Sequence, residues 1–294
     1  MPEGPTFRCR RCGASSPAQD ESWSCAAGCG AAFARRDGIW RVDQVEPAGF
    51  SAASREHLAS FEEDHFWFDG RQRLLLDLVY RGAPPRRAID LGCGNGRFLA
   101  ALAERGAAAT GVDAYADSLA RARAKAPGAT LIAAELGDLP LPSASFDLVA
   151  ALDVLEHLEP ARLLAEARRL LAPGGRLLLS VPAFACLWSR RDERAGHRLR
   201  YRRALLESEL AAHGFAPEFF THYQFLLFPL VWLSRRLDAR RPLPLERRPP
   251  GALGRLLGAV NRLEVGLFGG RRLPWGSSLI ALARPLPEAA GAAA

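Results

Sequence analysis

A sharp glycine-rich turn follows an apolar segment at residues 88–98, which read AIDLGCGNGRF. Gly92, Gly94 and Gly96 permit positive φ angles, and their lack of side chains lets a ligand approach the backbone. The apolar residues before the turn predict a buried strand, and those after it predict the start of a helix. A turn of this kind at a helix N-terminus indicates a site for a small polar ligand, but the turn alone does not identify that ligand.

Segments with strand and helix periodicity alternate over most of the remaining chain. Strands are expected at 87–91, 108–112, 129–133, 146–152 and 175–181, and helices at 54–81, 96–105, 116–126 and 160–171. Such alternation is typical of an α/β fold in which a parallel, doubly wound sheet carries helices on both faces.

An acidic residue stands at or just after the end of each of the first four expected strands: Asp90, Asp113, Glu135 and Asp153. Ligands of doubly wound sheets bind at these carboxyl ends, and Asp113 has the spacing of an acid that binds ribose hydroxyls. Several carboxylates would repel the pyrophosphate of NAD and attract a sulfonium and an ammonium group. The charge pattern, together with a G-x-G-x-G spacing shorter than G-x-G-x-x-G, therefore favours S-adenosylmethionine over NAD.

Residues 86–182 resemble the core of class I S-adenosylmethionine-dependent methyltransferases, in particular a type 11/23-like bacterial group. The resemblance lies in five segments that occur in the family's order: AIDLGCGNGRF, GVDAY, AAELGDLPLPSASFDLV, LDVLEHL and RRLLAPGGRLLLSVP. It implies methyltransferase activity and a Rossmann-like, seven-stranded sheet with an antiparallel last strand, here 218–225 paired with 277–284.

The same resemblance implies a set of cofactor-binding residues. Asp90 would order the glycine turn, Asp113 would bind the ribose, and Glu135 with Leu136 would border the adenine. The full implied set is Asp90, Gly92, Cys93, Gly94, Gly96, Asp113, Ala114, Glu135, Leu136 and Asp153.

Transfer of a methyl group to a hydroxyl needs at most one base, because the sulfonium is already activated. His157 follows the fourth strand, where the acceptor would lie, and is either this base or part of the pocket wall. His197 and Tyr201 are the other candidates. They belong to RRDERAGHRLRY, which resembles a D-x-x-x-G-H-x-x-R-Y insertion of methyltransferases found near cell-surface polysaccharide and lipid genes.

The segment FEEDHFWFDGR resembles an H-F-W-F-x-x-R entry motif of the same methyltransferases. Phe66, Trp67 and Phe68 either cover the pocket or pack their helix onto the sheet. Arg71 could bind an anionic substrate or the cofactor's carboxylate, or pair with an acid.

Four of the six cysteines lie close together, as Cys9-x2-Cys12 and Cys25-x3-Cys29. Four thiolates suit one tetrahedral Zn²⁺, and a segment too short and polar to bury a core of its own would need a metal to fold. The alternative is a set of free thiols. The stretch CGAAFARRDGIWRV resembles small zinc ribbons that precede some bacterial methyltransferase domains.

The Pro-, Gly- and Ser-rich residues 42–56 predict a linker. We therefore expect a zinc-ribbon-like module with linker at 1–47 and a methyltransferase domain at 48–288.

A helical insertion at about 226–272 is expected between the last two strands, with an apolar segment, an arginine-rich segment and an amphipathic helix. The stripe of that helix is formed by Leu253, Leu256, Leu257, Val260, Leu263 and Leu267. It either lies on an anionic membrane or packs as an ordinary cover over the cleft, and we favour the cover. Both interpretations indicate a large acceptor, such as a hydroxyl of a small molecule or of a lipid-linked or cell-surface glycan-related compound.

The formal net charge is +7, yet Lys125 is the only lysine and Arg, Ala, Gly and Pro are abundant. Codon bias explains this composition, so the charge is weak support for nucleic-acid binding. An RNA methyltransferase that uses the ribbon for recognition, and a non-catalytic cofactor- or partner-binding module, are the alternatives. Because no apolar leader follows Met1, we expect a cytoplasmic protein, and the insertion is the segment that could contact a membrane surface peripherally.

Overall fold

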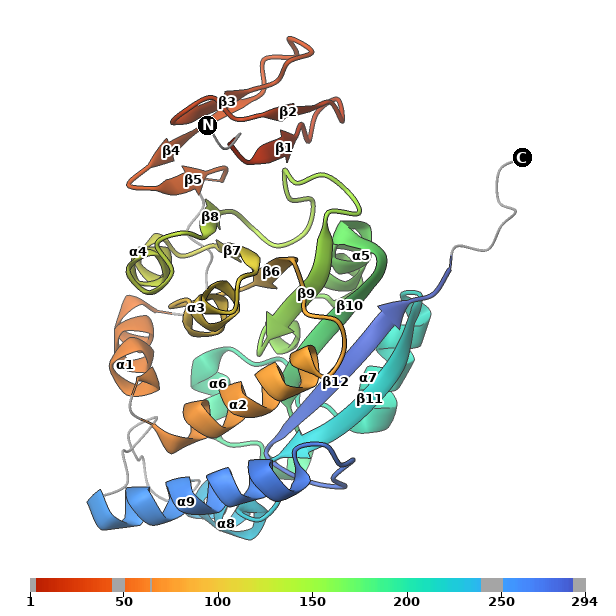
Figure 1. Ribbon diagram of the computed structural model, residues 1–294. Coiled ribbons are helices and arrows are strands. Elements are labelled where there is room, and N and C mark those ends of the chain that lie inside the picture. The colour runs from red at the N-terminus through yellow and green to blue at the C-terminus, as the bar shows by residue number, and fades with distance from the viewer. Residues whose placement is uncertain (1–3, 44–50, 64, 239–250, 288–294) are drawn as a thin grey trace.

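The computed structural model describes residues 4–43, 51–63, 65–238 and 251–287 (Figure 1). Within them, seven strands form the predicted α/β sheet, in the order β11-β12-β10-β9-β6-β7-β8. Their bounds are β6 Arg87–Leu91, β7 Ala108–Asp113, β8 Thr130–Ala133, β9 Phe146–Leu152, β10 Leu171–Pro182, β11 Phe215–Tyr223 and β12 Ser278–Pro285. The central pairs are parallel and β12 is antiparallel to both neighbours, which confirms the predicted sheet with an antiparallel last strand.

Helices cover both faces of this sheet because successive strand residues point to opposite sides. On one face Leu148 and Leu178 lie in a core with residues of α2 and α3, whereas on the other face Val149 and Leu179 lie in a core with residues of α5 and α7. The helix bounds are α2 Phe66–Tyr80, α3 Arg97–Glu104, α4 Ala116–Lys125, α5 Pro160–Leu170 and α7 Arg203–Ala212.

The prediction of one helix over 54–81 is wrong, because two helices occupy this segment: α1 (Ala52–Glu62) and α2. His65 has an extended backbone, so the helical conformation is interrupted before α2 begins. Its ring accepts a hydrogen bond from the backbone N–H of Trp67. A side chain that satisfies a first-turn N–H caps the second helix. The charged segment after β10 also differs from a plain surface loop, since it contains the short helix α6 (Arg190–Ala195).

The N-terminal module extends the main sheet. Its strands are β1 Thr6–Arg8, β2 Ser15–Pro17, β3 Ser22–Ser24, β4 Ala32–Arg36 and β5 Ile39–Arg41. Asp37 and Gly38 both have positive φ and form the tight turn between β4 and β5. Strand β5 pairs in parallel with β8, so that the module lies at the edge of the methyltransferase-like sheet, as Figure 1 shows.

The module buries apolar side chains in the core of the main sheet, which agrees with the expectation that it has no core of its own. Phe7, Trp23 and Trp40 are almost fully buried, and the rings of Phe7 and Trp40 meet edge to face with centroids 5.0 Å apart. Burial of such rings stabilises the module together with the sheet it extends. Residues 44–50 of the predicted linker lie outside the described residues, and the domain boundary stays a prediction.

The insertion forms α8 (Phe228–Asp238) and α9 (Gly251–Phe268), and α9 runs beside α2 (Figure 1). The face of α9 that is buried carries polar residues as well as Leu257. Asn261 donates a hydrogen bond to the hydroxyl of Tyr223, and Glu264 accepts one from the backbone N–H of Leu226 at 2.8 Å. No described helix is long and apolar enough to span a membrane.

Most of the predicted leucine stripe points away from the protein, so the expectation that its leucines pack as ordinary core residues is wrong, although Leu257 is buried. Leu256 is 60% exposed and Leu263 is 55% exposed, and Leu253 and Leu267 are exposed as well. The physical reason is that hydrogen bonding of Asn261 and Glu264 fixes the rotation of the helix and turns the leucines outward.

Candidate functional site

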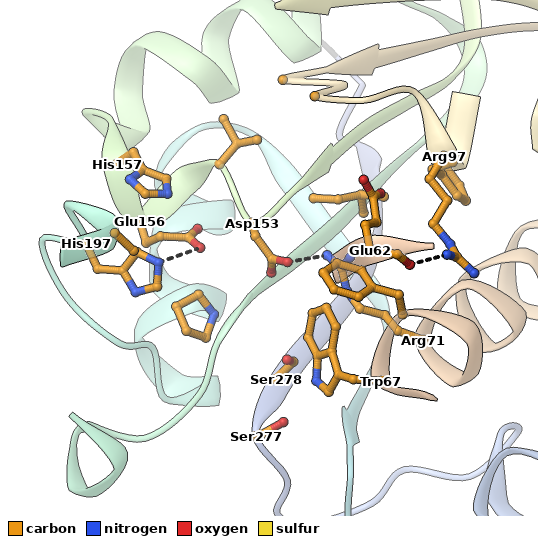
Figure 2. Close-up of a pocket in the computed structure, with 18 of the residues that line it drawn as sticks. Glu62, Trp67, Arg71, Arg97, Asp153, Glu156, His157, His197, Ser277 and Ser278 are labelled. Carbon is orange, nitrogen blue, oxygen red and sulfur yellow. Dashed lines mark hydrogen bonds and ion pairs between the residues drawn. The ribbon is translucent and has the colours of Figure 1, made fainter. Parts of the chain in front are cut away.

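A cavity of about 990 Å³ lies at the carboxyl ends of the parallel strands (Figure 2). The glycine turn, Asp113 and Glu135 line one part of it. The segment after β9, the segment around α6, the start of α2 and one side of α8 line the rest. All the predicted cofactor-binding residues line this cavity except Gly96, which instead precedes α3 with a φ of 76° and faces Ala122.

Asp113 holds the glycine turn in place. One of its carboxylate oxygens accepts a hydrogen bond from the backbone N–H of Gly94 and the other from that of Tyr115, both at 2.9 Å. The ordering role that the resemblance assigned to Asp90 is therefore carried out by Asp113. Gly94 itself has a φ of 51° and open space where a side chain would begin, so the turn leaves room for a ligand.

Asp90 is an unpaired acid below this turn. It is 2% exposed, and its Oδ1 atom has no hydrogen-bond partner among the described residues. Burial raises the pKa of its carboxyl to about 7, the positive charge of Arg71 opposes this shift, and the negative charge of Asp113 adds to it. A cationic ligand group near Asp90 would stabilise its ionised form.

Arg71 is already paired, in the middle of the cavity (Figure 2). Its guanidinium lies 2.6 Å from a carboxylate oxygen of Asp153, and the hydroxyl of Ser180 donates to the other oxygen of Asp153 at 3.0 Å. The guanidinium also lies over the ring of Trp67, 4.9 Å from its centroid. Of the alternatives left open for Arg71, the structure shows the pairing with an acid.

The aromatic entry motif serves both roles considered for it. Phe66, Trp67 and Phe68 line the cavity, and Trp67 also packs against Tyr223 with ring centroids 6.0 Å apart. These rings form an apolar wall of the site while they fix α2 to the sheet.

Glu156, His157 and His197 lie together at the opposite end of the cavity from Trp67 (Figure 2). Nε2 of His197 is 3.9 Å from a carboxylate oxygen of Glu156, and the two imidazole centroids are 5.0 Å apart. Glu156 is fully buried, and burial, reinforced by the charge of Asp153, raises the pKa of its carboxyl well above the usual value. His157 is exposed at the cavity mouth.

Asp192 fixes the orientation of His197. This carboxylate is fully buried and accepts a hydrogen bond from Nδ1 of His197 at 2.9 Å. It also lies 2.8 Å from a guanidinium nitrogen of Arg200 and 3.0 Å from one of Arg235. Burial raises the pKa of Asp192, but the hydrogen bond from His197 and the positive charges of Arg200 and Arg235 together hold it below the usual value. The charged segment after β10 is thus an ordered part of the site.

Tyr201 does not line the cavity. Its side chain is 1% exposed, it belongs to the hydrophobic core under the sheet, and burial raises the pKa of its hydroxyl. The last residue of the D-x-x-x-G-H-x-x-R-Y segment therefore packs in the core, while Asp192 and His197 reach the cavity.

Glu62 and Arg235 are among the cavity residues that were not found from the sequence. Glu62 accepts a hydrogen bond from the side-chain amide of Asn95, which joins α1 to the glycine turn. Arg235 of α8 binds Asp192 although the two are far apart along the chain. Arg235 lies in an arginine-rich segment that is indistinguishable from a charged surface, so no local signal marked it.

The N-terminal module contacts the loop that carries Glu135. The carboxylate of Asp43 accepts a hydrogen bond from the backbone N–H of Glu135 at 3.1 Å, and the N–H of Arg8 donates to the carbonyl of Pro140 at 3.1 Å. The module thereby supports the wall of the cavity next to Leu136.

The four predicted metal ligands of this module gather at one point. The sulfur atoms of Cys9 and Cys29 are 3.4 Å apart, and those of Cys12 and Cys25 are 3.3 Å apart. All four lie within 4.8 Å of one another, so the cluster has the size and the donor set of a tetrahedral thiolate site.

Residues 89–179 match a family model described as "Methyltransferase domain", which covers the glycine turn, Asp113 and the Asp153–His157 segment. The chain contains a class I S-adenosylmethionine-dependent methyltransferase domain. The matched segment also contains most of the residues that form the cofactor end of the cavity, and the geometry of that end fits the cofactor.

Similar proteins share this domain over part of their length. The chain is 30% identical over 141 residues to a "Probable S-adenosylmethionine-dependent methyltransferase" of Mycolicibacterium smegmatis, which covers 48% of this chain and 54% of that protein. It is 36% identical over 114 residues to an "Uncharacterized methyltransferase" of Mycobacterium bovis, which covers 39% and 44%. The chain thus spans about half the length of the curated relatives it matches.

Solved structures support the fold. Geranyl diphosphate C-methyltransferase from Streptomyces coelicolor, solved with Mg²⁺, geranyl diphosphate and S-adenosyl-L-homocysteine, has a TM-score of 0.55 at 15% identity. The match covers 82% of this chain and 86% of that one. At this identity the likeness concerns the methyltransferase fold alone.

The ionisation of Asp90 leads to a pH-dependent cofactor affinity. In the free domain its carboxyl is protonated below about pH 7, whereas a bound ammonium group favours the carboxylate, so binding releases a proton. Affinity for S-adenosylhomocysteine should rise about tenfold between about pH 5.5 and 7.5. Calorimetry across this range measures the effect. Asp90→Asn should remove the rise, and an unchanged pH profile in that variant would contradict the role of Asp90.

Proposed function

We propose that this methyltransferase domain transfers a methyl group from S-adenosylmethionine to a hydroxyl oxygen of an amphiphilic acceptor, such as a lipid-linked or cell-surface glycan-related compound. One observation carries the proposal. The cavity joins an acidic end that fits the cofactor to a second end that presents Glu156, His157 and His197, and α8 supplies an apolar wall between it and the surface. The substrate class rests on this wall and on the sequence resemblance of the charged segment.

The second end of the cavity suits the removal of a proton from the acceptor. As the acceptor oxygen bonds to the methyl carbon, the carbon–sulfur bond breaks, its electron pair stays on sulfur, and the hydroxyl proton must leave. The exposed position of His157 marks an opening of the cavity through which this proton can reach solvent. The aromatic side chains of Phe66, Trp67 and Phe68 line the cavity and would limit the access of water to the sulfonium.

The insertion supports an acceptor with a lipid part. Leu227 and Leu257 line the cavity, and Leu230 both lines it and is 48% exposed, so that the wall continues to the outer surface. Exposed apolar residues continue over both helices of the insertion: Leu230, Trp232, Leu233, Leu237, Leu253, Leu256, Leu263 and Leu267. An apolar surface of this extent beside arginines binds the interface of an anionic membrane. We therefore propose that the protein works at a membrane surface.

The four-cysteine cluster supports a structural zinc ion in the N-terminal module. Thiolates so close together need a cation to offset their mutual repulsion, and Zn²⁺ prefers this ligand set. Through Asp43 and Arg8, a zinc-ordered module would hold the loop of Glu135 in place.

Methyl transfer is tested with S-adenosylmethionine and extracted lipids and glycans, whose methylated products are detected by mass spectrometry. Gly94→Ala should weaken cofactor binding more than about tenfold, because its methyl group would occupy the open space of the glycine turn. Gly106→Ala is the matched control. It has a similar left-handed backbone and equally open surroundings, but it does not line the cavity. Equal cofactor affinity in both variants, or no methylated product, would contradict the proposal.

Membrane contact is tested by sedimentation with phosphatidylglycerol vesicles. The double variant Leu256→Glu, Leu263→Glu should bind these vesicles at least about tenfold more weakly, since it removes apolar area and adds negative charge. Leu205→Glu changes a similarly exposed leucine on α7 and should bind normally. The membrane role fails if the unmodified protein does not sediment, or if both variants sediment alike.

The zinc site is tested by metal analysis of freshly purified, reduced protein. Cys9→Ser with Cys12→Ser should lose one zinc ion per chain and weaken S-adenosylhomocysteine binding about tenfold, because the loop of Glu135 loses its support. Cys186→Ser alters an exposed cysteine outside the cluster and should change neither quantity. Full zinc content in the double variant would exclude these ligands.

A further inference from the structure

Glu156 poses a problem that the methyltransferase fold does not solve. Its side chain is completely buried, yet neither carboxylate oxygen has a hydrogen-bond partner among the described residues. A buried carboxylate without partners is costly, and native proteins supply it with hydrogen bonds, a cationic side chain or a metal ion. The nearest guanidinium groups are already paired, since Arg71 binds Asp153 and Arg200 binds Asp192.

Two imidazoles complete a ligand set around this carboxylate. One ligand atom each from Glu156, His157 and His197 can be chosen so that all three lie within 4.8 Å of one another. Ligands of a tetrahedral ion at about 2.0–2.1 Å lie about 3.3 Å apart, so the three ligand atoms need to move slightly closer together to hold an ion. Figure 2 shows the three side chains converging on the same part of the cavity.

Both imidazoles are held by their other nitrogen atoms, as metal-binding histidines are. Nδ1 of His197 is bonded to the carboxylate of Asp192 at 2.9 Å, and Nδ1 of His157 lies 3.3 Å from the carbonyl oxygen of Gly196. In each ring this hydrogen bond places the proton on Nδ1 and leaves Nε2 free to bind a metal. The carboxylate–histidine–metal arrangement explains why Asp192 is buried at this position.

We propose that Glu156, His157 and His197 bind a divalent transition-metal ion of the zinc type, and that this ion holds an oxygen of the methyl acceptor. Two imidazoles and one carboxylate are a ligand set for such ions, and three protein ligands leave a coordination position open for a substrate oxygen. A hydroxyl bound there loses its proton more readily. The acceptor part of this inference rests on the proposed function, whereas the metal site stands on the geometry.

The site is tested by titrating Co²⁺ into protein whose cysteine cluster already holds zinc, with the visible absorption of bound cobalt as the readout. The unmodified protein should bind one Co²⁺ at this site. Glu156→Gln, His157→Ala and His197→Ala should each weaken binding by about 10- to 100-fold or more. His213→Ala is the control, because His213 lies 3.9 Å from Glu209 on α7, a histidine–carboxylate pair outside the cavity.

Calorimetry of S-adenosylhomocysteine binding is the folding control. The affinity of the three variants should equal that of the unmodified protein, which would show that they are folded. The metal site is rejected if the unmodified protein binds no Co²⁺ beyond the cysteine cluster, or if the three variants bind it as tightly as His213→Ala does. If methyl transfer survives both chelation and Glu156→Gln, the role of the ion in holding the acceptor is rejected, while the proposed function stays intact. A last outcome separates the two proposals. If the three variants abolish Co²⁺ binding but neither they nor the unmodified protein transfer a methyl group, the metal site is supported and the proposed function is rejected.

Discussion

Buried negative charge is the constraint on which the rest of this site depends. A parallel sheet places the carboxyl ends of its strands at one edge, so the acids that follow them enter one poorly solvated cavity. The protein neutralises some of them itself: backbone N–H groups bind Asp113, Arg71 pairs with Asp153, and two arginines with a histidine surround Asp192. Asp90 and Glu156 receive no such partner among the described residues. These two positions are therefore where an external cation is bound most favourably.

The two unpaired acids also divide the cavity by function. Asp90 lies under the glycine turn, where an ammonium group of the cofactor fits, and Glu156 lies beside the two histidines at the acceptor end. Between them, the ion pair of Arg71 and Asp153 separates the two negative sites and reduces their mutual repulsion. Arg71 thus stabilises both ends of the cavity, and its charge is already neutralised by Asp153.

Sequence patterns predicted the features that depend on local spacing. The positions of the strands, the glycine turn, the cysteine cluster and the acids after the strands all follow from periodicity and residue spacing, whereas the antiparallel last strand was implied by the family resemblance. Partnerships between distant segments could not be predicted in this way. Asp192 meets Arg235 only because α8 folds back over the cavity, and Asp43 meets Glu135 only because β5 pairs with β8. Similarly, the leucine periodicity of α9 identified a helix, but the hydrogen bonds of buried polar residues decided which face points inward.

The insertion links the surface to the chemistry through a single helix. Leu230 and Arg235 of α8 line the cavity. Leu233 and Leu237 of the same helix are exposed at the surface. The arginine binds Asp192, which in turn orients His197. In the proposed membrane contact, a movement of this helix would shift Arg235 and with it the hydrogen bonds around Asp192. The same helix thus contributes both to the exposed apolar surface of the insertion and to the hydrogen bonds that hold Asp192.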